Sequence, residues 1–353
     1  MWQAGKTTTD LGIGGMPLQL APLVGADLLV NLGDMFTGNM AKEKFVQAYL
    51  EAGRFTQNGK PYYPVMPFMG ELMTLNVNKK LYAKAGLVDA QGNPLPAKDW
   101  DEFENQLRKL KAVSPGFALS VDWGWNFIFY SYAGGIQAIK GSIYSPTNPK
   151  ILDFESKAAL KWLTLNQRWI KEGLASSGTI TDVNYGRNNF KAGIIPAIYT
   201  AHSRFIEAGQ TLGEENTSMV PIPGAMKNGS IIYTHAVYIP KVSPAIDLAK
   251  QFIREQIFSR WFQQWGFNHY GKLPVISDYY GEGITWYQKE TSKILEIAKR
   301  SVAMPKYKGS EELLDILLEQ IDPMLLGKQT PAKTLENIRK SIIRRKVDLT
   351  RLD

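Results

Sequence analysis

Short apolar runs alternate with helical segments along most of this chain, and that alternation restricts the fold more than any single motif. Residues 71–77 and 117–121 have the length and composition of strands. Residues 155–173, which end in a glycine, and residues 244–258 are predicted helices. Strands separated by helices are typical of α/β proteins. We therefore expect an α/β protein with mostly parallel sheets.

Capping residues mark where several helices should begin. Asp99 is a candidate N-cap, and Glu102 stands three residues later, as in a capping box. Ser243–Pro244 and Thr330–Pro331 each combine an N-cap side chain with a proline suited to the first helical turn. A short helix is expected over Asn78–Ala85.

Length and composition favour a globular protein with two lobes. The chain has 353 residues, more than one hydrophobic core usually serves, and 44% of them are hydrophobic. Much of the formal charge of +8 lies in residues 333–351, where apolar residues recur with helical spacing. Because no zinc-finger, RNP or KH pattern accompanies that charge, we interpret the segment as the solvated face of a terminal helix and expect no nucleic-acid partner.

The sequence lacks the motifs of several kinds of binding and catalytic site. The chain has no cysteine, which excludes disulfides, thiolate metal sites and a lipidated cysteine within it. The uncharged run 11–26 is too short and too interrupted for a spanning helix or a signal peptide. Residues 5–7 lack the upstream part of a phosphate-binding loop. The three histidines are too far apart for a helical metal pair, and no G-x-S-x-G motif occurs. The residues therefore give no local support to a bound cofactor, to a metal site or to a serine hydrolase with this motif.

Aromatic residues are abundant, and some stand beside polar groups. The chain has 9 Trp, 16 Tyr and 15 Phe, most densely around Asp122–Asn126. A pyranose stacks its apolar face on an aromatic ring while its hydroxyls donate to a carboxylate. Trp123 and Trp125 flank a glycine at an expected strand end, where ligand contact and core packing both remain open. The aromatic residues within 127–132 are expected to be core.

One isolated carboxylate, Glu71, lies in the otherwise apolar extended part of the segment 59–87. Charged side chains are rarely buried unless they are paired. From the residues alone, a buried ion pair explains Glu71 as well as a ligand contact does.

A series of motifs follows one order along the chain, from Thr9–Asp10 to about Arg345. Its most specific parts are Gly59-Lys-Pro-Tyr62, Asn76-Val-Asn-Lys-Lys-Leu-Tyr-Ala-Lys-Ala-Gly-Leu87 and Pro96-Ala-Lys-Asp-Trp-Asp-Glu-Phe103. The later members are residues 116–119, 133–135, 189–193, 199–203, 221–224 and 236–240. In this order the motifs resemble those of the extracellular carbohydrate-binding proteins of ABC transporters, the maltose-binding-protein-like solute-binding protein family 1.

The resemblance implies a periplasmic-binding-protein-like fold of type II, with two α/β lobes and the ligand cleft between them. One lobe would be 1–70 with 237–292 and the other 71–236 with 293–353, with crossings near 70, 236 and 293–303. Such a protein catalyses nothing. It closes on a sugar or oligosaccharide by hinge motion and delivers it to a membrane permease, outside the cytoplasm in an extracellular or periplasmic location.

The resemblance also implies where the ligand binds. Glu71 matches a carboxylate that contacts sugar in the family, and Asp122 falls where the family has another carboxylate. His202 stands in place of a family tryptophan, and His235 replaces a glycine at the second crossing. The complete set of expected ligand-binding residues is Met16, Gln19, Glu71, Asp122, Trp123, Trp125, His202, Arg204 and His235.

One departure from the family concerns the start of the chain. Family members begin with a strand, a helix and a second strand, whereas Met1–Gly5 resembles the end of the following helix. The resemblance therefore implies either that the start is miscalled or truncated, or that the chain folds with an incomplete first lobe. An incomplete lobe is expected to be poorly stable or to pair with another chain, whereas a complete lobe is expected to be monomeric.

Two other functions remain open from the sequence. A receptor for a non-sugar solute, such as a peptide, a polyamine or a phosphate ester, is the nearer alternative. A glycoside hydrolase would use Glu71 and Asp122 as its carboxylate pair.

Overall fold

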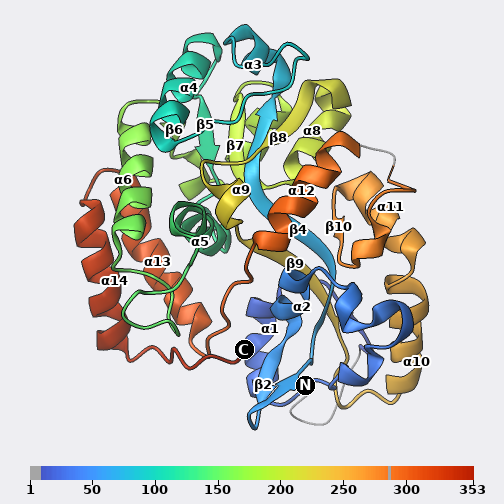
Figure 1. Ribbon diagram of the computed structural model, residues 1–353. Helices are drawn as coiled ribbons and strands as arrows, with labels where there is room; N and C mark the ends of the chain where they lie inside the picture. Colours follow the sequence, from blue (N-terminus) through green and yellow to red (C-terminus); the bar gives the residue numbers. More distant parts are fainter. Residues whose placement is uncertain (1–8, 285–287) are drawn as a thin grey trace.

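A computed structural model describes residues 9–284 and 288–353, and in this part the strands form one mixed sheet and one small hairpin (Figure 1). The predicted helix end at Met1–Gly5 lies outside the described residues. The sheet order is β1-β9-β4-β7-β5-β6, with β8 and β10 also paired to β4, and β2 pairs β3 in the hairpin. The strands are β1 (Gly12–Ile13), β2 (Phe55–Gln57), β3 (Lys60–Tyr62), β4 (Met66–Asn78), β5 (Leu119–Val121), β6 (Ala175–Ser176), β7 (Ala197–Ala201), β8 (Thr217–Val220), β9 (Ile232–Tyr238) and β10 (Leu273–Pro274).

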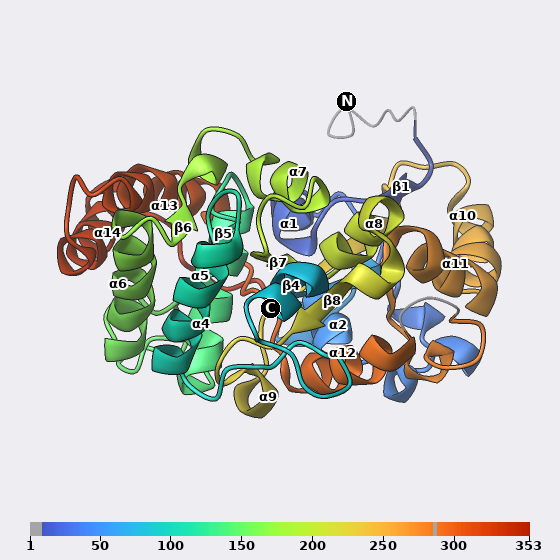
Figure 2. The same ribbon diagram turned by 90° about the horizontal axis from the view of Figure 1, so that it is seen from above.

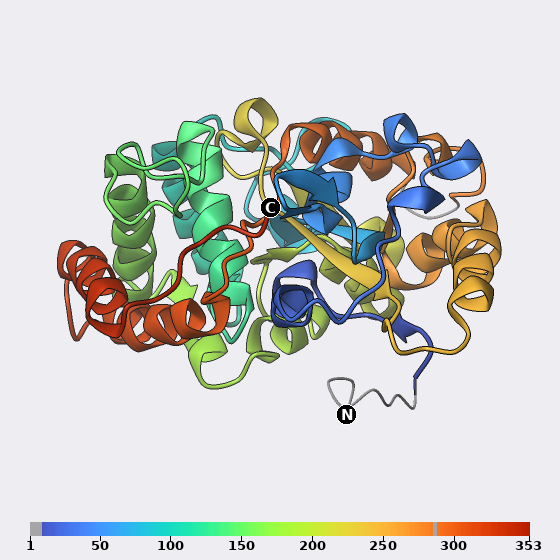
Figure 3. The ribbon, with the colours of Figure 1, turned by 90° about the horizontal axis from the view of Figure 1, so that it is seen from below.

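Helices cover the sheet and gather at the two ends of the molecule. Figures 2 and 3 show α6 and α14 at one end, α10 and α11 at the other, and α1 between the two groups. The α-helices are α1 (Pro17–Gly25), α2 (Gln47–Gly53), α3 (Lys79–Lys84), α4 (Trp100–Val113), α5 (Phe127–Lys140), α6 (Lys157–Lys171), α7 (Tyr185–Lys191), α8 (Ser203–Leu212), α9 (Ala225–Asn228), α10 (Ile246–Phe252), α11 (Arg260–Tyr270), α12 (Gln288–Arg300), α13 (Ser310–Leu325) and α14 (Pro331–Arg345). A π-helical turn over Ile253–Ile257 follows α10, and short 3₁₀ turns occupy 33–35, 38–40, 42–44, 178–180, 214–216 and 277–279. None of the helices in this described part is long and apolar enough to span a bilayer.

The prediction of mostly parallel sheets is wrong. Strand β4 runs antiparallel to β7, β8, β9 and β10, and among the described strands β5 pairs in parallel with β6 and β7. The reason is that β4 is one long strand shared by two halves of the sheet. Its residues up to Leu72 pair with β9, and those from Met73 onward pair with β7. Both of these neighbouring strands run in the direction opposite to β4.

The central strand is longer than the predicted run 71–77. It begins at Met66, and all of its residues are buried. Its register shifts between Pro67 and Met69, which lets the strand continue past a proline that cannot donate a hydrogen bond to its neighbour. A strand that is covered on both faces carries apolar side chains on both faces. This is why apolar and polar residues do not alternate along β4.

The helix starts predicted from N-caps at Asp99 and Thr330 are correct, and the short helix predicted from Asn78 also has an N-cap. The N-cap side chains of Asp99, Thr330 and Asn78 each accept a hydrogen bond from a backbone N–H in the first helical turn, at 2.8–3.2 Å. The start predicted at Ser243 is wrong. Its hydroxyl accepts from the Ala245 N–H at 3.0 Å, which forms a tight turn before α10 begins at Ile246.

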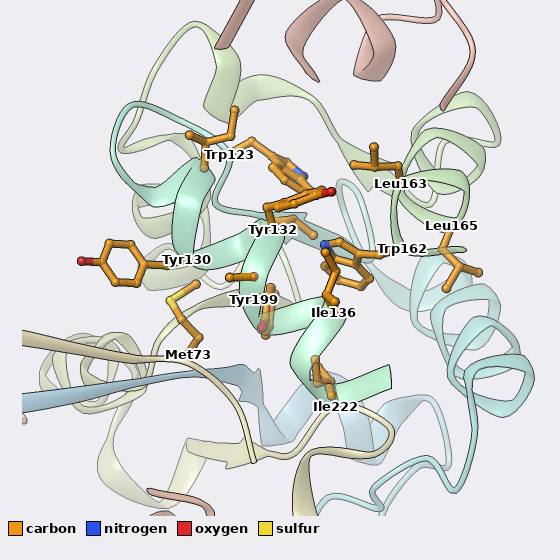
Figure 4. Close-up of a cluster of buried hydrophobic side chains, with 14 of the residues drawn as sticks. Met73, Trp123, Tyr130, Tyr132, Ile136, Trp162, Leu163, Leu165, Tyr199 and Ile222 are labelled. Carbon is orange, nitrogen blue, oxygen red and sulfur yellow. The ribbon is translucent and has the colours of Figure 1, made fainter. Parts of the chain in front are cut away.

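Two large hydrophobic cores and one small cluster lie within the described residues. One core is built around α4, α5, α6, α13 and α14, and Figure 4 shows Trp123, Tyr132 and Trp162 within it. The second is built around α2, β9, α8 and α11. A smaller cluster joins α1 to the β2–β3 hairpin through Leu20, Val24 and Phe55. Helix α1 therefore contributes to two clusters, because Leu18 packs in the first core with α5 and α13, whereas Leu20 and Val24 pack toward the hairpin.

Candidate functional site

A pocket of about 370 Å³ lies where α1 meets α5 and α13, and we call it the α1–α5–α13 pocket. Its volume suits a small organic ligand, which commonly binds in clefts of this size between separately packed parts of a protein. Its lining consists of Leu18, Gln19, Trp125, Asn126, Phe129, Ser310, Glu311, Leu314 and Asp315.

The start of α1 is held by a glycine turn and by contacts of Met16. Gly14 and Gly15 have φ values of 103° and 78°, a backbone region that favours glycine. The Met16 N–H donates to Gln19 Oε1 at 3.2 Å, and the sulfur of Met16 accepts from the Tyr130 hydroxyl at 3.2 Å. Met16 is therefore buried against α5, whereas the exposed Gln19 lines the pocket.

Trp125 presents its ring to the pocket. Its side chain is 57% exposed, and its backbone has φ of 47°, which is unusual for a bulky residue. The preceding Gly124 packs so closely that an added Cβ would lie 2.6 Å from the Thr179 carbonyl oxygen. Because Gly124 fixes the loop against this neighbour, the chain turns Trp125 outward just before α5.

Trp123 points the opposite way. It is fully buried in the core of α4–α6, with its ring centroid 6.3 Å from that of Trp162. Its ring has no exposed face, and it does not line the α1–α5–α13 pocket. Of the two roles considered for Trp123 and Trp125, ligand contact or core packing, the structure gives Trp123 a position in the core.

Asn126 supplies a buried polar group at the pocket. The residue is only 7% exposed, and its side-chain Nδ2 has no hydrogen-bond partner among the described residues. An unsatisfied buried amide costs on the order of 1–3 kcal/mol, which an acceptor oxygen on a ligand would offset. Sequence reasoning did not select Asn126, although it ends the Asp122–Asn126 motif.

Two carboxylates complete the lining. Glu311 and Asp315 stand four residues apart near the start of α13, so they share one face of the helix. Neither forms an ion pair or a hydrogen bond within residues 9–284 and 288–353. Sequence reasoning missed both because α13 lies beyond the last specific motif of the series.

Glu71 does not reach this pocket. The residue is 1% exposed, its Oε1 pairs with the Lys272 ammonium, and its Oε2 accepts from the Ser203 hydroxyl at 2.6 Å. His235 Nε2 lies 4.0 Å from the same carboxylate, and burial lowers the pKa of His235. Glu71 thus joins β4 to the segments around Ser203 and Lys272, and this geometry favours the buried ion pair over a ligand contact.

His202 also has a structural role. It is fully buried, its Nδ1 accepts from the Leu72 N–H at 3.0 Å, and its Nε2 donates to the Gly271 carbonyl at 2.7 Å. Burial lowers the pKa of His202 to about 4, so the ring is neutral near pH 7. Both ring nitrogens of His202 are therefore bonded to backbone groups, and His202 does not line the α1–α5–α13 pocket.

The remaining predicted residues are dispersed. Asp122 accepts from the Thr200 hydroxyl at 2.9 Å, and burial raises the pKa of Asp122 to about 7. Asp122 lines a separate cavity of only about 10 Å³, which is too small for a sugar. Arg204 pairs with Glu207 at 3.1 Å. Of the predicted set, the structure places Gln19 and Trp125 together at the α1–α5–α13 pocket.

A larger pocket, of about 680 Å³, lies in the other lobe. It is bordered by Lys44, Arg254 and Arg260 as well as by Glu255 and Asp278. None of its lining residues was predicted from the sequence, and none carries a buried side-chain polar atom without a partner. No described residue cluster in the protein has the composition of a metal site. We therefore assign the candidate binding site to the α1–α5–α13 pocket.

Comparisons with known proteins agree with this architecture. A family model described as bacterial extracellular solute-binding protein matches residues 2–255. No curated protein matches the chain in sequence. Many solved structures are similar to it, and they are only distantly related in sequence.

Three of these structures illustrate the likeness. Maltose-bound MalE3 of T. maritima has a TM-score of 0.81 and 16% identity, with 98% of this chain and 86% of that chain covered. The GacH receptor of Streptomyces glaucescens, solved unliganded and with acarbose, has a TM-score of 0.79 and 15% identity, covering 98% and 85%. An ABC transporter solute-binding protein of Thermotoga lettingae, bound with α-D-tagatose, has a TM-score of 0.76 and 19% identity, covering 97% and 87%. At these identities the likeness shows the fold, and it confirms the predicted two-lobed α/β architecture.

Proposed function

Because the chain belongs to the bacterial extracellular solute-binding proteins, we propose that it captures a sugar or an oligosaccharide in the α1–α5–α13 pocket. It then delivers this ligand to the permease of an ABC transporter, without chemical change and outside the cytoplasm. The maltose, acarbose and α-D-tagatose bound by the similar proteins support a carbohydrate ligand.

The observation that carries the proposal is the exposed ring of Trp125. A tryptophan that is 57% exposed at a pocket has no packing reason to be there, and its unusual backbone conformation directs it outward. The polar groups of Gln19, Asn126 and Asp315 surround it. A flat apolar surface with hydrogen-bonding groups at its rim matches a pyranose, which has an apolar face and a rim of hydroxyls.

The pocket also lies where a hinge motion would change its shape. We propose the lobes 1–70 with 237–292 and 71–236 with 293–353, with crossings near 70, 236 and 293–303. The change of partners along β4 between Leu72 and Met73 supports the first crossing. The parallel bridge between Ile231 and Val302 brings two of the crossing segments side by side. Rotation about these segments moves α1 relative to α5 and α13 and closes the pocket on its ligand.

A screen with a matched pair of tryptophan variants tests the proposal. Thermal stability is measured with a panel of mono- and oligosaccharides, and hits are quantified by calorimetry. Trp125→Ala should weaken binding about fivefold, the equivalent of about 1 kcal/mol of stacking, and Trp125→Phe should restore part of the affinity. Trp261→Ala is the control, because Trp261 is 69% exposed on α11, away from the pocket.

Two results would overturn the proposal. Stabilisation by peptides, polyamines or phosphate esters, with none by any carbohydrate, would assign the protein to another solute class. Unchanged sugar affinity in Trp125→Ala, in a variant that is folded, would move the binding site away from the α1–α5–α13 pocket.

A further inference from the structure

The α1–α5–α13 pocket carries a charge opposite to that of the whole protein. The chain has a formal net charge of +8, yet no Lys, Arg or His is among the described residues that line this pocket. Its only charged lining residues there are Glu311 and Asp315. The remaining polar lining groups belong to Gln19, Asn126 and Ser310, which are neutral.

A contribution to the stability of α13 explains only one of the two carboxylates in this pocket. A carboxylate in the first turn of a helix interacts favourably with the helix dipole, and this applies to Glu311 and Glu312 on α13. Asp315 lies one turn further on, where the dipole effect has decayed. Glu312 does not line the pocket, whereas Glu311 and Asp315 both do, without a cationic partner in the described part of the chain.

A second observation at the same place points to a ligand. Asn126 is more than nine-tenths buried, lines the pocket, and holds an amide Nδ2 without a partner among the described residues. That amide would donate to a hydroxyl oxygen. The two carboxylates act only as hydrogen-bond acceptors. The exposed face of Trp125 attracts cations through its ring quadrupole. One ligand that satisfies all four groups has hydroxyls, an apolar face and a positive charge.

We propose that the pocket prefers a sugar that carries a protonated amine over its neutral counterpart. This inference rests on the proposed function and names the chemical class of its ligand. The ammonium donates to Glu311 and Asp315, while a hydroxyl accepts from Asn126 and the sugar ring lies against Trp125. Acidic sugars and sugar phosphates are disfavoured, because their charge meets two carboxylates and no cation.

Paired ligands isolate the contribution of the charge. Glucose, galactose and mannose are each compared with the 2-amino-2-deoxy derivative of the same sugar, and cellobiose with the β-1,4-linked glucosamine disaccharide. Titrations at about pH 6 keep the amines protonated. We expect the amine to bind about fivefold tighter than its neutral partner, the difference between a charged and a neutral hydrogen bond. Raising the salt concentration should reduce that preference.

Charge-neutralising variants test which residues are responsible. Glu311→Gln with Asp315→Asn should abolish the preference for the amine, measured as the ratio of the affinities for the amine and the neutral sugar in the same variant. Asp315→Asn alone should remove part of the preference and leaves the first turn of α13 intact. Glu312→Gln is the matched control, and it should keep the full preference.

The outcomes separate this inference from the proposed function. Equal binding of amine and neutral sugars, or a preference that survives in the double variant, overturns the inference while sugar binding stands. Binding of polyamines such as spermidine, with no binding of any sugar, overturns both.

Discussion

Glu71→Ala should impair folding far more than ligand binding. Glu71 is 1% exposed, and its two oxygens are held by the Lys272 ammonium and the Ser203 hydroxyl. Its removal leaves the Lys272 ammonium, whose side chain is only 19% exposed, without a counter-charge. Breaking one side of a buried pair costs about 3–5 kcal/mol, and the unpaired hydroxyl adds about 1 kcal/mol. Because Lys272 keeps some contact with water, we expect a loss of about 3–4 kcal/mol.

The pH dependence of this loss provides a second test. Burial lowers the pKa of Lys272 to about 8, below the value of about 10.5 for an unfolded lysine. In the variant no carboxylate stabilises the ammonium, so the pKa of Lys272 should fall further. Below about pH 8 the folded variant then loses a proton that the folded wild type keeps, and only the variant gains stability as the pH rises. The deficit relative to the wild type should therefore shrink as the pH rises toward about 8 and stay constant above it.

Urea unfolding followed by tryptophan fluorescence measures the stability, and calorimetry with a sugar that binds measures the affinity. The double variant Glu71→Ala with Lys272→Met should recover much of the lost stability, because it removes the unpaired charge. We expect less than a threefold change in affinity for either variant. A large loss of affinity with unchanged stability would refute the buried-pair argument and return Glu71 to the binding site.

Two further predictions concern buried titratable groups. Because burial lowers the pKa of His202 to about 4, protonation of the unfolded state should remove about 3 kcal/mol of stability as the pH falls from about 6.5 to 4. His202→Asn should flatten this pH dependence, whereas the exposed control His269→Asn should not. Burial raises the pKa of Asp122 to about 7, so the protein loses stability as the pH rises from the ordinary pKa of an aspartate to about 7, where the buried carboxyl ionises. Asp122→Asn should stabilise the protein more at pH 8 than at pH 5, and an equal effect at both values in urea unfolding would contradict the burial argument.

Local features of the fold were predictable from the sequence because they depend on residues close together in the chain. The N-caps at Asp99 and Thr330 bond to backbone groups three residues away, and an apolar run long enough for a strand surrounds Glu71. The start at Ser243 was misplaced because its hydroxyl forms a turn that resembles a cap. Such alternatives differ by a single local hydrogen bond, which composition does not distinguish.

The candidate site was only partly predictable. The sequence singled out Trp125 and Gln19, and both line the α1–α5–α13 pocket, although Gln19 lies in the first turn of α1 rather than on the predicted loop. The opposite directions of Trp123 and Trp125 depend on the close approach of Gly124 to Thr179, which lies in a distant part of the chain. No pattern near Asp315 indicated that its carboxylate would face the same pocket.

The sequence by itself determined the α/β class, several helix starts and the family of this protein, because all three rest on local periodicity, capping or the order of motifs. Only the tertiary structure decided which distant groups meet. It paired Glu71 with Lys272, bonded both nitrogens of His202, and placed α13 beside α1 and α5. The physical reason is that hydrogen bonds, ion pairs and pockets form between segments far apart in the chain, and their partners are selected only when the long strand β4 arranges the two lobes around it.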